Sequence, residues 1–317
     1  MANQTLPPLL LKFAQALGTS IHNHQLLIPE KFGSGYCSGF VFNKHIRLMI
    51  ADYKLDLDLP IENPDFDAAK RMLFFKFQNV LPHEEKVANK NRYSNLSSVL
   101  IGTSRVNTDD VIAVHSNTSV VNIEIDVNYL NSLFSLADKS PVLQSLLTNT
   151  QPLLYEQFIY PALQTIIDSI VSEPVNETFK LFFLKIKAEE LVCRLLMELE
   201  KRDDQRIYPL NTHDLQTIYK IKAQMLNCLD TPPVITRLSV DAGMSPTKLK
   251  RVFKQVFGNS IFSYYQNIRM QEAARLLRED KLSVSATGYR LGFTNLSHFS
   301  RVFQEHLGVK PKQYSKD

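Results

Sequence analysis

The 317-residue sequence has few of the features that mark secreted, membrane-spanning or metal-clustered proteins. Its three cysteines, Cys37, Cys193 and Cys228, are far apart and odd in number, so they predict neither a disulfide framework nor a metal-ligand spacing. No charged-then-apolar leader opens the chain, and its apolar runs are far shorter than the ~20 residues of a membrane-spanning helix. We therefore expect a cytoplasmic protein with reduced, buried thiols and no membrane partner.

Motifs of enzymatic chemistry are also missing, since the sequence has neither a nucleophile elbow nor a phosphate-binding loop. The adjacent pairs Glu84-Glu85 and Asp109-Asp110 would point in different directions rather than converge on a substrate. His22-Asn23-His24 has an HxH spacing, but Glu30 and the glycines do not follow where a metal-binding cupin needs them. The remaining candidate histidines, His45, His83 and His115, are isolated. We expect no enzyme activity, no metal and no cofactor.

Positive charge is concentrated towards the C-terminus. Residues 218–317 hold 16 Lys and Arg against 7 Asp and Glu, a net charge of +9, whereas residues 1–217 hold 20 against 25, a net charge of −5. A basic block joined to a mildly acidic remainder is typical of a nucleic-acid-binding module attached to another domain. An accidental solvated face is the alternative.

Residues from about 20 to 128 have the pattern of strands. Apolar and polar residues alternate cleanly in Tyr53–Leu59 and Val121–Asp126, which favours an antiparallel sheet with one wet face. The predicted strands are Tyr36–Phe42, Ile46–Leu59, Met72–Phe77, Val99–Thr103, Val111–Val114 and Ser119–Val127. Several short strands at this spacing predict a sandwich or barrel, whose interior can hold a small ligand.

Residues from about 129 to 201 change to the period of helices. The predicted helices are Pro141–Thr148, Gln151–Ser172 and Glu177–Lys201. The last is more apolar than packing on one side requires, which leaves two interpretations: a dimer interface, or packing within its own domain. The interface candidates are Phe179, Phe182, Ile186 and Leu195.

The domain boundary is expected between Lys201 and Asn211. Residues 201–206 form a charged run that is either a linker or a fraying helix end. Asn211 or Thr212 then offers an N-cap for a further helix that the Pro232-Pro233 pair stops. The predicted domains are therefore 1–205 and 211–317.

A sequence pattern typical of two consecutive helices occurs twice in the C-terminal domain, over Val234–Gly258 and Val284–Gly308. Each copy reads as a short helix, a turn at Gly243 or Gly292, and an amphipathic helix closed by a glycine. This is the pattern of a helix-turn-helix, whose second helix enters the major groove of DNA. A long helix from Phe262 to Glu279 would hold the two reading heads at a fixed separation, near the ~34 Å of one DNA turn.

The polar sides of the two second helices are the candidate DNA-binding faces. In the first copy the charged face carries Lys248, Lys250, Arg251 and Lys254. In the second copy the outward set is Asn295, Ser297, His298, Ser300, Arg301 and Gln304.

From about residue 215 to the end, the chain resembles the DNA-binding domain of the AraC/XylS family of bacterial transcription regulators. The matching segments are Ala242–Ser245, Leu249–Lys254, Arg269–Leu277, Leu291–Phe293, Phe299–Phe303 and Gly308–Tyr314. Residues 257–265 look most like the branch that includes siderophore-responsive regulators.

The resemblance implies specific roles for residues of both heads. Base contacts are implied for Thr247, Lys250 and Arg251 in the first head, and for Leu296, Ser297 and Arg301 in the second. Phosphate contacts are implied for Lys248, Lys254 and Arg237. For Arg301 the alternative is an ion pair with Glu305, four residues on.

The second head departs from the family pattern at Thr287-Gly288, where an aliphatic residue and Ala are usual. Glycine in a helix interior costs roughly 1 kcal/mol relative to alanine. We therefore expect the second head to be less firmly packed, so that the first head anchors binding and the second tunes it.

Together these patterns predict an α+β protein, with a cupin-like antiparallel β-sandwich and dimerisation helices followed by an all-α double helix-turn-helix domain. The expected function is that of a homodimeric, sequence-specific transcription regulator controlled by a small-molecule effector. Its expected partners are double-stranded DNA, the effector and RNA polymerase. The alternative is a cupin-type small-molecule-binding protein or enzyme with an accessory DNA-binding tail.

Overall fold

The computed structural model describes residues 6–56, 71–81, 96–106, 117–133, 139–202 and 206–315. The described chain forms two compact units, the first ending at His213 and the second beginning at Asp214. Each unit buries its own set of apolar side chains. The predicted domain limits, 1–205 and 211–317, stay predictions.

The first unit contains a seven-stranded antiparallel sheet. In chain order its strands are β1 (Gln25–Leu27), β2 (Gly33–Val41), β3 (Ile46–Leu55), β4 (Met72–Gln78), β5 (Ser98–Thr103), β6 (Asn117–Asp126) and β7 (Leu154–Phe158). Their order across the sheet is β1-β2-β3-β6-β4-β5-β7. The central pair, β3 and β6, is in register from Ile46 opposite Ile125 to Lys54 opposite Asn117. Strands distant in sequence are thus joined into one layer.

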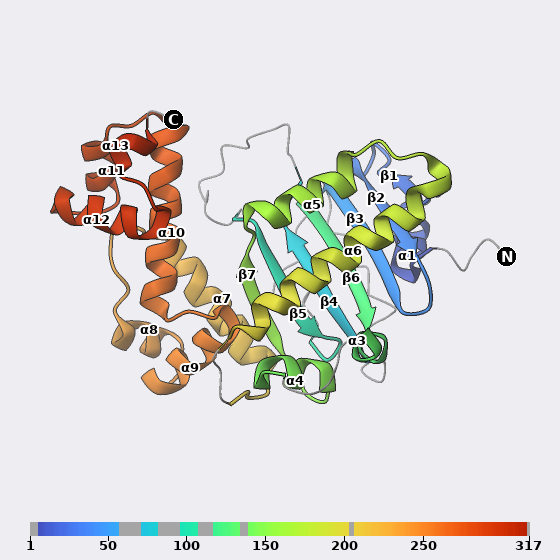
Figure 1. The fold of residues 1–317 in the computed structure, drawn as a ribbon, viewed down its shortest axis with the longest axis horizontal. Helices are drawn as coiled ribbons and strands as arrows, with labels where there is room; N and C mark the ends of the chain where they lie inside the picture. The colour runs from blue at the N-terminus through green and yellow to red at the C-terminus, as the bar shows by residue number, and fades with distance from the viewer. Residues whose placement is uncertain are drawn as a thin grey trace. The chain divides into compact units, whose positions relative to one another are not determined.

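Helices pack against this sheet. They are α1 (Pro8–Leu17), α3 (Val127–Leu133), α4 (Pro141–Thr148), α5 (Pro161–Ser172) and α6 (Glu177–Glu200). Figure 1 shows α5 and α6 lying across one face, and their buried residues share a core with β3, β4, β5 and β6. At the edge of the sheet formed by β1 and β2, α1 packs with β1, β2 and β3 around Phe13, Leu26 and Cys37.

The α+β class is confirmed, and five of the six predicted strands are confirmed within a few residues. The sixth, Val111–Val114, lies outside the described residues. All described strands belong to one sheet whose core is completed by helices. The cupin-like sandwich is therefore not confirmed.

The predicted helix over Gln151–Ser172 was wrong in its first half. Residues 154–158 form the strand β7 on the edge of β5, and the helix begins only at Pro161. Leu154, Tyr155 and Glu156 are all buried in that strand. The apolar run at 153–155 is compatible with a helix or a strand, and hydrogen bonding to β5 makes this segment a strand.

The second unit is helical. Its helices are α7 (Thr212–Asn227), α8 (Ile235–Asp241), α9 (Pro246–Phe257), α10 (Ile261–Arg278), α11 (Val284–Arg290), α12 (Leu296–Leu307) and α13 (Pro311–Tyr314). The helix α10 packs on α9, α11, α12 and α13. All of these helices except the short α13 were expected from the repeated two-helix pattern and the segments beside it.

The prediction of three buried thiols was wrong for two of them. Cys37 is buried, but Cys193 on α6 and Cys228 just after α7 are exposed. Burial raises the pKa of the Cys37 thiol, and the nearby Asp52 carboxylate adds to this effect. Within the described ranges, no helix combines the length and apolar character needed to cross a bilayer.

Candidate nucleic-acid interface

The first helix-turn-helix consists of α8, a turn at Gly243 and α9. Gly243 has φ of 59°, the left-handed conformation that favours glycine. The Ser245 hydroxyl accepts a hydrogen bond of 3.2 Å from the Lys248 amide, and Pro246 occupies the first helical turn. Ser245 is therefore the N-cap that the sequence predicted, and it fixes where α9 starts.

Helix α9 has one buried and one exposed face. Leu249, Val252, Phe253 and Val256 are buried, and Phe253 packs against Phe257 and Tyr264. The exposed residues include Thr247, Lys250, Arg251 and Lys254. The buried apolar face of α9 thus anchors the helix, and its opposite face is polar and positively charged. Such a face suits a helix that enters the major groove.

Lys248 differs from the other basic residues of α9. Its Nζ lies 2.8 Å from Oδ1 of Asp214, in the first turn of α7. The Asp214 side chain is 11% exposed and that of Lys248 is 40% exposed. This ion pair connects α9 to α7, whereas the sequence predicted a phosphate contact for Lys248.

The second helix-turn-helix consists of α11, a turn at Gly292 with φ of 75°, and α12. The Asn295 side chain accepts a hydrogen bond of 3.1 Å from the His298 amide and is the N-cap of α12. Asn295 is thus committed to starting the helix. Ser297 and Arg301 are exposed beyond it, and Phe299, Val302 and Phe303 form the buried side.

Gly288 is a close-packing point between α11 and α12. It is buried, and a Cβ built there would lie 2.7 Å from Cδ2 of Leu296 and 3.2 Å from Cδ1 of Phe299. The expectation that Gly288 loosens the second head is therefore wrong, because glycine lets the two helices approach closely. Leu296, predicted to reach DNA, is half-buried against this site.

Arg301 faces solvent on α12. Its Nε lies 3.9 Å from Oε1 of Glu305, and the two side chains are 70% and 62% exposed. An ion pair this long and this exposed contributes little, so it does not compete strongly with a DNA phosphate or base. The alternative assignment of Arg301 to a purely structural ion pair is weak.

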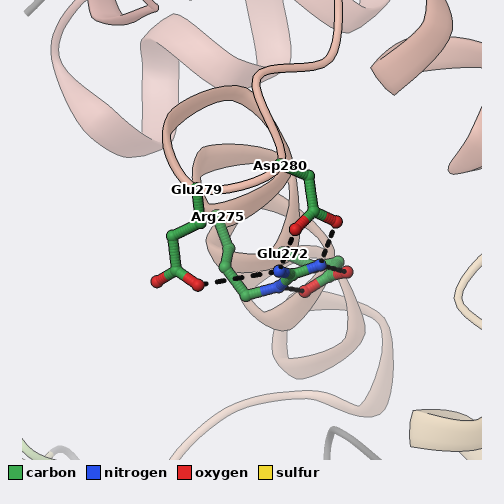
Figure 2. Close-up of polar contacts among 4 residues, drawn as sticks. All are labelled: Glu272, Arg275, Glu279 and Asp280. Carbon is green, nitrogen blue, oxygen red and sulfur yellow. Dashed lines mark hydrogen bonds and ion pairs between the residues drawn. The ribbon is translucent and has the colours of Figure 1, made fainter. Parts of the chain in front are cut away.

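The C-terminal end of α10 is held by a cluster of charges (Figure 2). Arg275 bonds both oxygens of Glu272 at 2.8 and 3.0 Å and both oxygens of Asp280 at 2.9 and 3.0 Å. Glu279 lies further away, at 3.7 Å. Hydrogen bonds to Glu272 and Asp280 raise the pKa of Arg275. The cluster ties the last turn of α10 to the loop that leads into α11.

The interface candidates on α6 divide into two groups. Phe179, Phe182 and Ile186 are 62%, 66% and 45% exposed, but Leu195 is 0% exposed. Leu195 lies on the opposite side of α6, in a buried row with Leu184, Ala188 and Leu191. Its assignment to a dimer interface was wrong, because one helix carries two apolar faces and only one of them is open.

Three of the histidines considered for metal binding contact nearby side chains. The His22 ring bonds the Ser20 hydroxyl at 2.8 Å, the His24 ring stacks on Phe40, and the His45 ring stacks on Tyr129. No group of three or more His, Cys, Asp or Glu suited to a metal occurs in the parts that the structure describes. His83, His115 and the pairs Glu84-Glu85 and Asp109-Asp110 lie outside those parts.

Two N-capped helices on one compact unit, each with a polar face in front of an aromatic core, define a double helix-turn-helix DNA-binding domain. Comparison with known proteins agrees, since residues 238–317 match the family described as a helix-turn-helix domain.

Three relatives show which proteins contain a similar sequence. The chain is 32% identical over 88 residues to the HTH-type transcriptional regulator GlxA of Rhizobium meliloti, covering 28% of this chain and 27% of that protein. It is 31% identical over 71 residues to the arabinose operon regulatory protein of Escherichia coli, covering 22% and 24%. It is 28% identical over 178 residues to histidine kinase P4 of Formosa agariphila, covering 53% and 12%.

Residues 238–317 therefore form a helix-turn-helix domain of the AraC type, similar to the domains of these regulators, as the resemblance implied. The chain spans between 12% and 44% of the lengths of the curated relatives compared with it. These relatives include both regulators and a protein named as a kinase, so they identify the domain rather than the whole chain.

Proposed function

We propose that this protein is a cytoplasmic, sequence-specific transcription regulator that contacts two successive major grooves through α9 and α12. The observation that carries the proposal is the pair of N-capped helices with exposed polar faces, both packed against α10. The net charge of +9 on residues 218–317 supports attraction to the phosphate backbone.

In this proposal some residues of the first head contact bases and others contact phosphates. Thr247, Lys250 and Arg251 lie near the start of α9 and read base edges, with Arg251 able to donate two hydrogen bonds to one guanine. Lys254, one turn further along, contacts phosphate. In the second head Ser297 and Arg301 are the exposed reading residues.

Selection of bound duplexes from a random library, followed by affinity measurement with Arg251→Ala, tests this function. Arg251→Ala should weaken binding to the selected sequence by about 1–3 kcal/mol and relax the preference at one base pair. Lys220→Ala is the matched control, because it removes one charge from an exposed position on α7. Unchanged affinity of Arg251→Ala, or enrichment of no sequence by the wild type, would contradict the proposal.

We further propose that the protein is a homodimer whose interface is the open apolar face of α6. Phe179, Ile186 and Cys193 recur every seven residues, so they lie along one side of the helix, with Phe182 beside them. Large apolar side chains exposed in a continuous row mark a protein–protein contact. The symmetric partner of such a face is a second copy of itself.

The reactivity of the Cys193 thiol can be used to detect the dimer, because Cys193 lies on the proposed interface. Thiol labelling should be slow at Cys193 and fast at Cys228, which is exposed outside this face. Replacing Phe182 and Ile186 with glutamate should give a monomer by sedimentation and restore fast labelling of Cys193. A dimer that survives both replacements would place the interface elsewhere.

The first unit, in this proposal, binds the small-molecule effector. A depression of about 450 Å³ opens at the edge of the sheet where β5 and β7 meet α5. It is lined by Ser97, Ile159, Tyr160, Pro161, Gln164 and Thr165. Mixed polar and apolar walls suit a small organic ligand. A thermal-shift screen of small molecules against wild type and Thr165→Trp tests this location, since a true ligand loses its stabilising effect in the filled variant.

A further inference from the structure

Two residues of α10, one turn apart, bond the segment before the first head and the turn of the second head. The Tyr265 hydroxyl donates a hydrogen bond of 2.8 Å to the carbonyl oxygen of Leu229, in the segment between α7 and α8. Nε of Arg269 donates one of 2.8 Å to the carbonyl oxygen of Leu291, and Nη2 bonds the same oxygen. Leu291 is the C-cap of α11, at the turn of the second helix-turn-helix.

Arg269 is 4% exposed, and its guanidinium lies in a site suited to a cation. It lies 3.7 Å from the centroid of the Phe293 ring and 5.4 Å from that of Tyr265. Its partner carbonyl lies at the C-terminal end of α11, where the helix dipole favours positive charge. These contacts offset the cost of burial, which lowers the pKa of Arg269.

The turn of the second head also packs closely on the segment that precedes the first head. Gly292 has φ of 75°, and a Cβ built on it would lie 1.9 Å from the carbonyl oxygen of Asp230. The turn of the second head is therefore packed on the backbone that leads into the first head. The interhead junction consists of Leu229, Asp230, Tyr265, Arg269, Leu291 and Gly292.

We propose that the interhead junction fixes the spacing and relative rotation of α9 and α12, with Arg269 as its central positioning residue. This inference rests on the proposed function. It means that the protein accepts one number of base pairs between the two half-sites that a single chain reads. Specificity then comes from the distance between half-sites as well as from their bases.

The geometry of DNA makes this rigidity measurable. Each base pair advances the groove by about 3.4 Å and rotates it by roughly 35°, so two added base pairs turn the second half-site by roughly 70°. A rigid pair of heads cannot follow that rotation, and one head must release its half-site. Loosened heads can follow it.

The test compares full-length wild type with Arg269→Met and Tyr265→Phe on duplexes that carry the wild-type half-sites. Base pairs are inserted or deleted, one or two at a time, between the half-sites. We expect wild type to lose at least about tenfold in affinity at two added base pairs, and both variants to lose less than about threefold relative to their own best spacing. Affinity for a duplex with only the first half-site should stay at the wild-type value.

Arg278→Met is the matched control, because it removes a guanidinium from the same helix at a place outside the junction, over the Tyr314 ring. It should keep the strict spacing of the wild type. Arg269→Lys, which keeps the positive charge but loses the planar fork of donors, should show an intermediate spacing profile. If Arg269→Met does not fold, as judged by circular dichroism, Tyr265→Phe decides the matter, since it removes a single oxygen.

Three outcomes are separable. A wild type that binds its half-sites equally well at every spacing would overturn the inference and leave the proposed function intact. A folded Arg269→Met or Tyr265→Phe variant with the wild-type spacing profile would also overturn it. A wild type that selects no sequence at all would contradict the proposed function itself.

Discussion

The Lys248 ammonium on α9 is paired with the Asp214 carboxylate on α7, with Nζ 2.8 Å from Oδ1. Three of the four basic residues of α9 are exposed, and this one is drawn back against a nearly buried acid. A residue type that suggests DNA contact in the sequence therefore acts as a brace in the structure.

Lys248→Met should destabilise the unit more and DNA binding less than Lys254→Met. Because the Lys248–Asp214 pair is half-exposed, its loss should lower the free energy of unfolding by about 1–2 kcal/mol. Lys254→Met should leave stability nearly unchanged but reduce the slope of log affinity against log salt by about 1, as expected for one lost phosphate contact. Denaturant titrations and salt-dependent affinities measure both effects. Equal changes in salt slope would show that Lys248 contacts phosphate after all.

Alanine at the two turn glycines should have very different costs. Gly243→Ala meets no atom within 4 Å and should cost about 1 kcal/mol, the penalty of a left-handed residue with a Cβ. Gly292→Ala adds a clash with the Asp230 backbone, so we expect a loss of about 3 kcal/mol or more. Equal midpoints in urea for the two variants would show that the contact between the heads is not formed in solution.

Thr287→Val should stabilise the second head. Thr287 is fully buried, and its hydroxyl has no hydrogen-bond partner within the described part of the chain. Valine keeps the branched shape and removes the unpaired polar group, so the free energy of unfolding should rise by about 1 kcal/mol. Thr247→Val, at an exposed position, is the control for β-branched propensity and should change stability little. A destabilised Thr287→Val protein would mean that the hydroxyl is paired in solution.

Cys37 should resist thiol reagents in the folded protein. Burial keeps its pKa above the ordinary thiol value, so at pH 8 almost no reactive thiolate is present and access is blocked. Cys228 should react quickly under the same conditions, and mass spectrometry after brief labelling separates the two sites. In guanidinium chloride both should react alike. Rapid modification of Cys37 without denaturant would show that the α1 core opens readily.

Local signals in the sequence were reliable where the structure is local. Ser245 and Pro246 start α9, and glycines at 243, 258, 292 and 308 take positive φ at the turns and helix ends. Each of these effects depends on a few consecutive residues, so it survives any tertiary arrangement. The strands β2 to β6 and the helices α4 and α6 of the first unit were predictable because each follows the apolar periodicity of its own segment.

The sequence-based predictions failed where contacts between distant segments determine the structure of a residue. Residues 154–158 form a strand because β5 offers an open edge, and Leu195 is buried because the sheet covers one side of α6. Periodicity shows which residues of a helix share an apolar face. It does not show which of two apolar faces is buried in the core. Arg269 and Tyr265 were missed as positioning residues for a related reason, since their partner carbonyls carry no sequence signal.

The sequence by itself determined that the chain carries two copies of a DNA-reading element, because caps, turns and amphipathic faces are written within each copy. Only the tertiary structure decided how the copies are joined. The buried guanidinium of Arg269 bonds a backbone carbonyl 22 residues away, and Gly292 packs on the backbone of residue 230. Backbone atoms are the same in every residue, so contacts made to them appear only when the chain has folded.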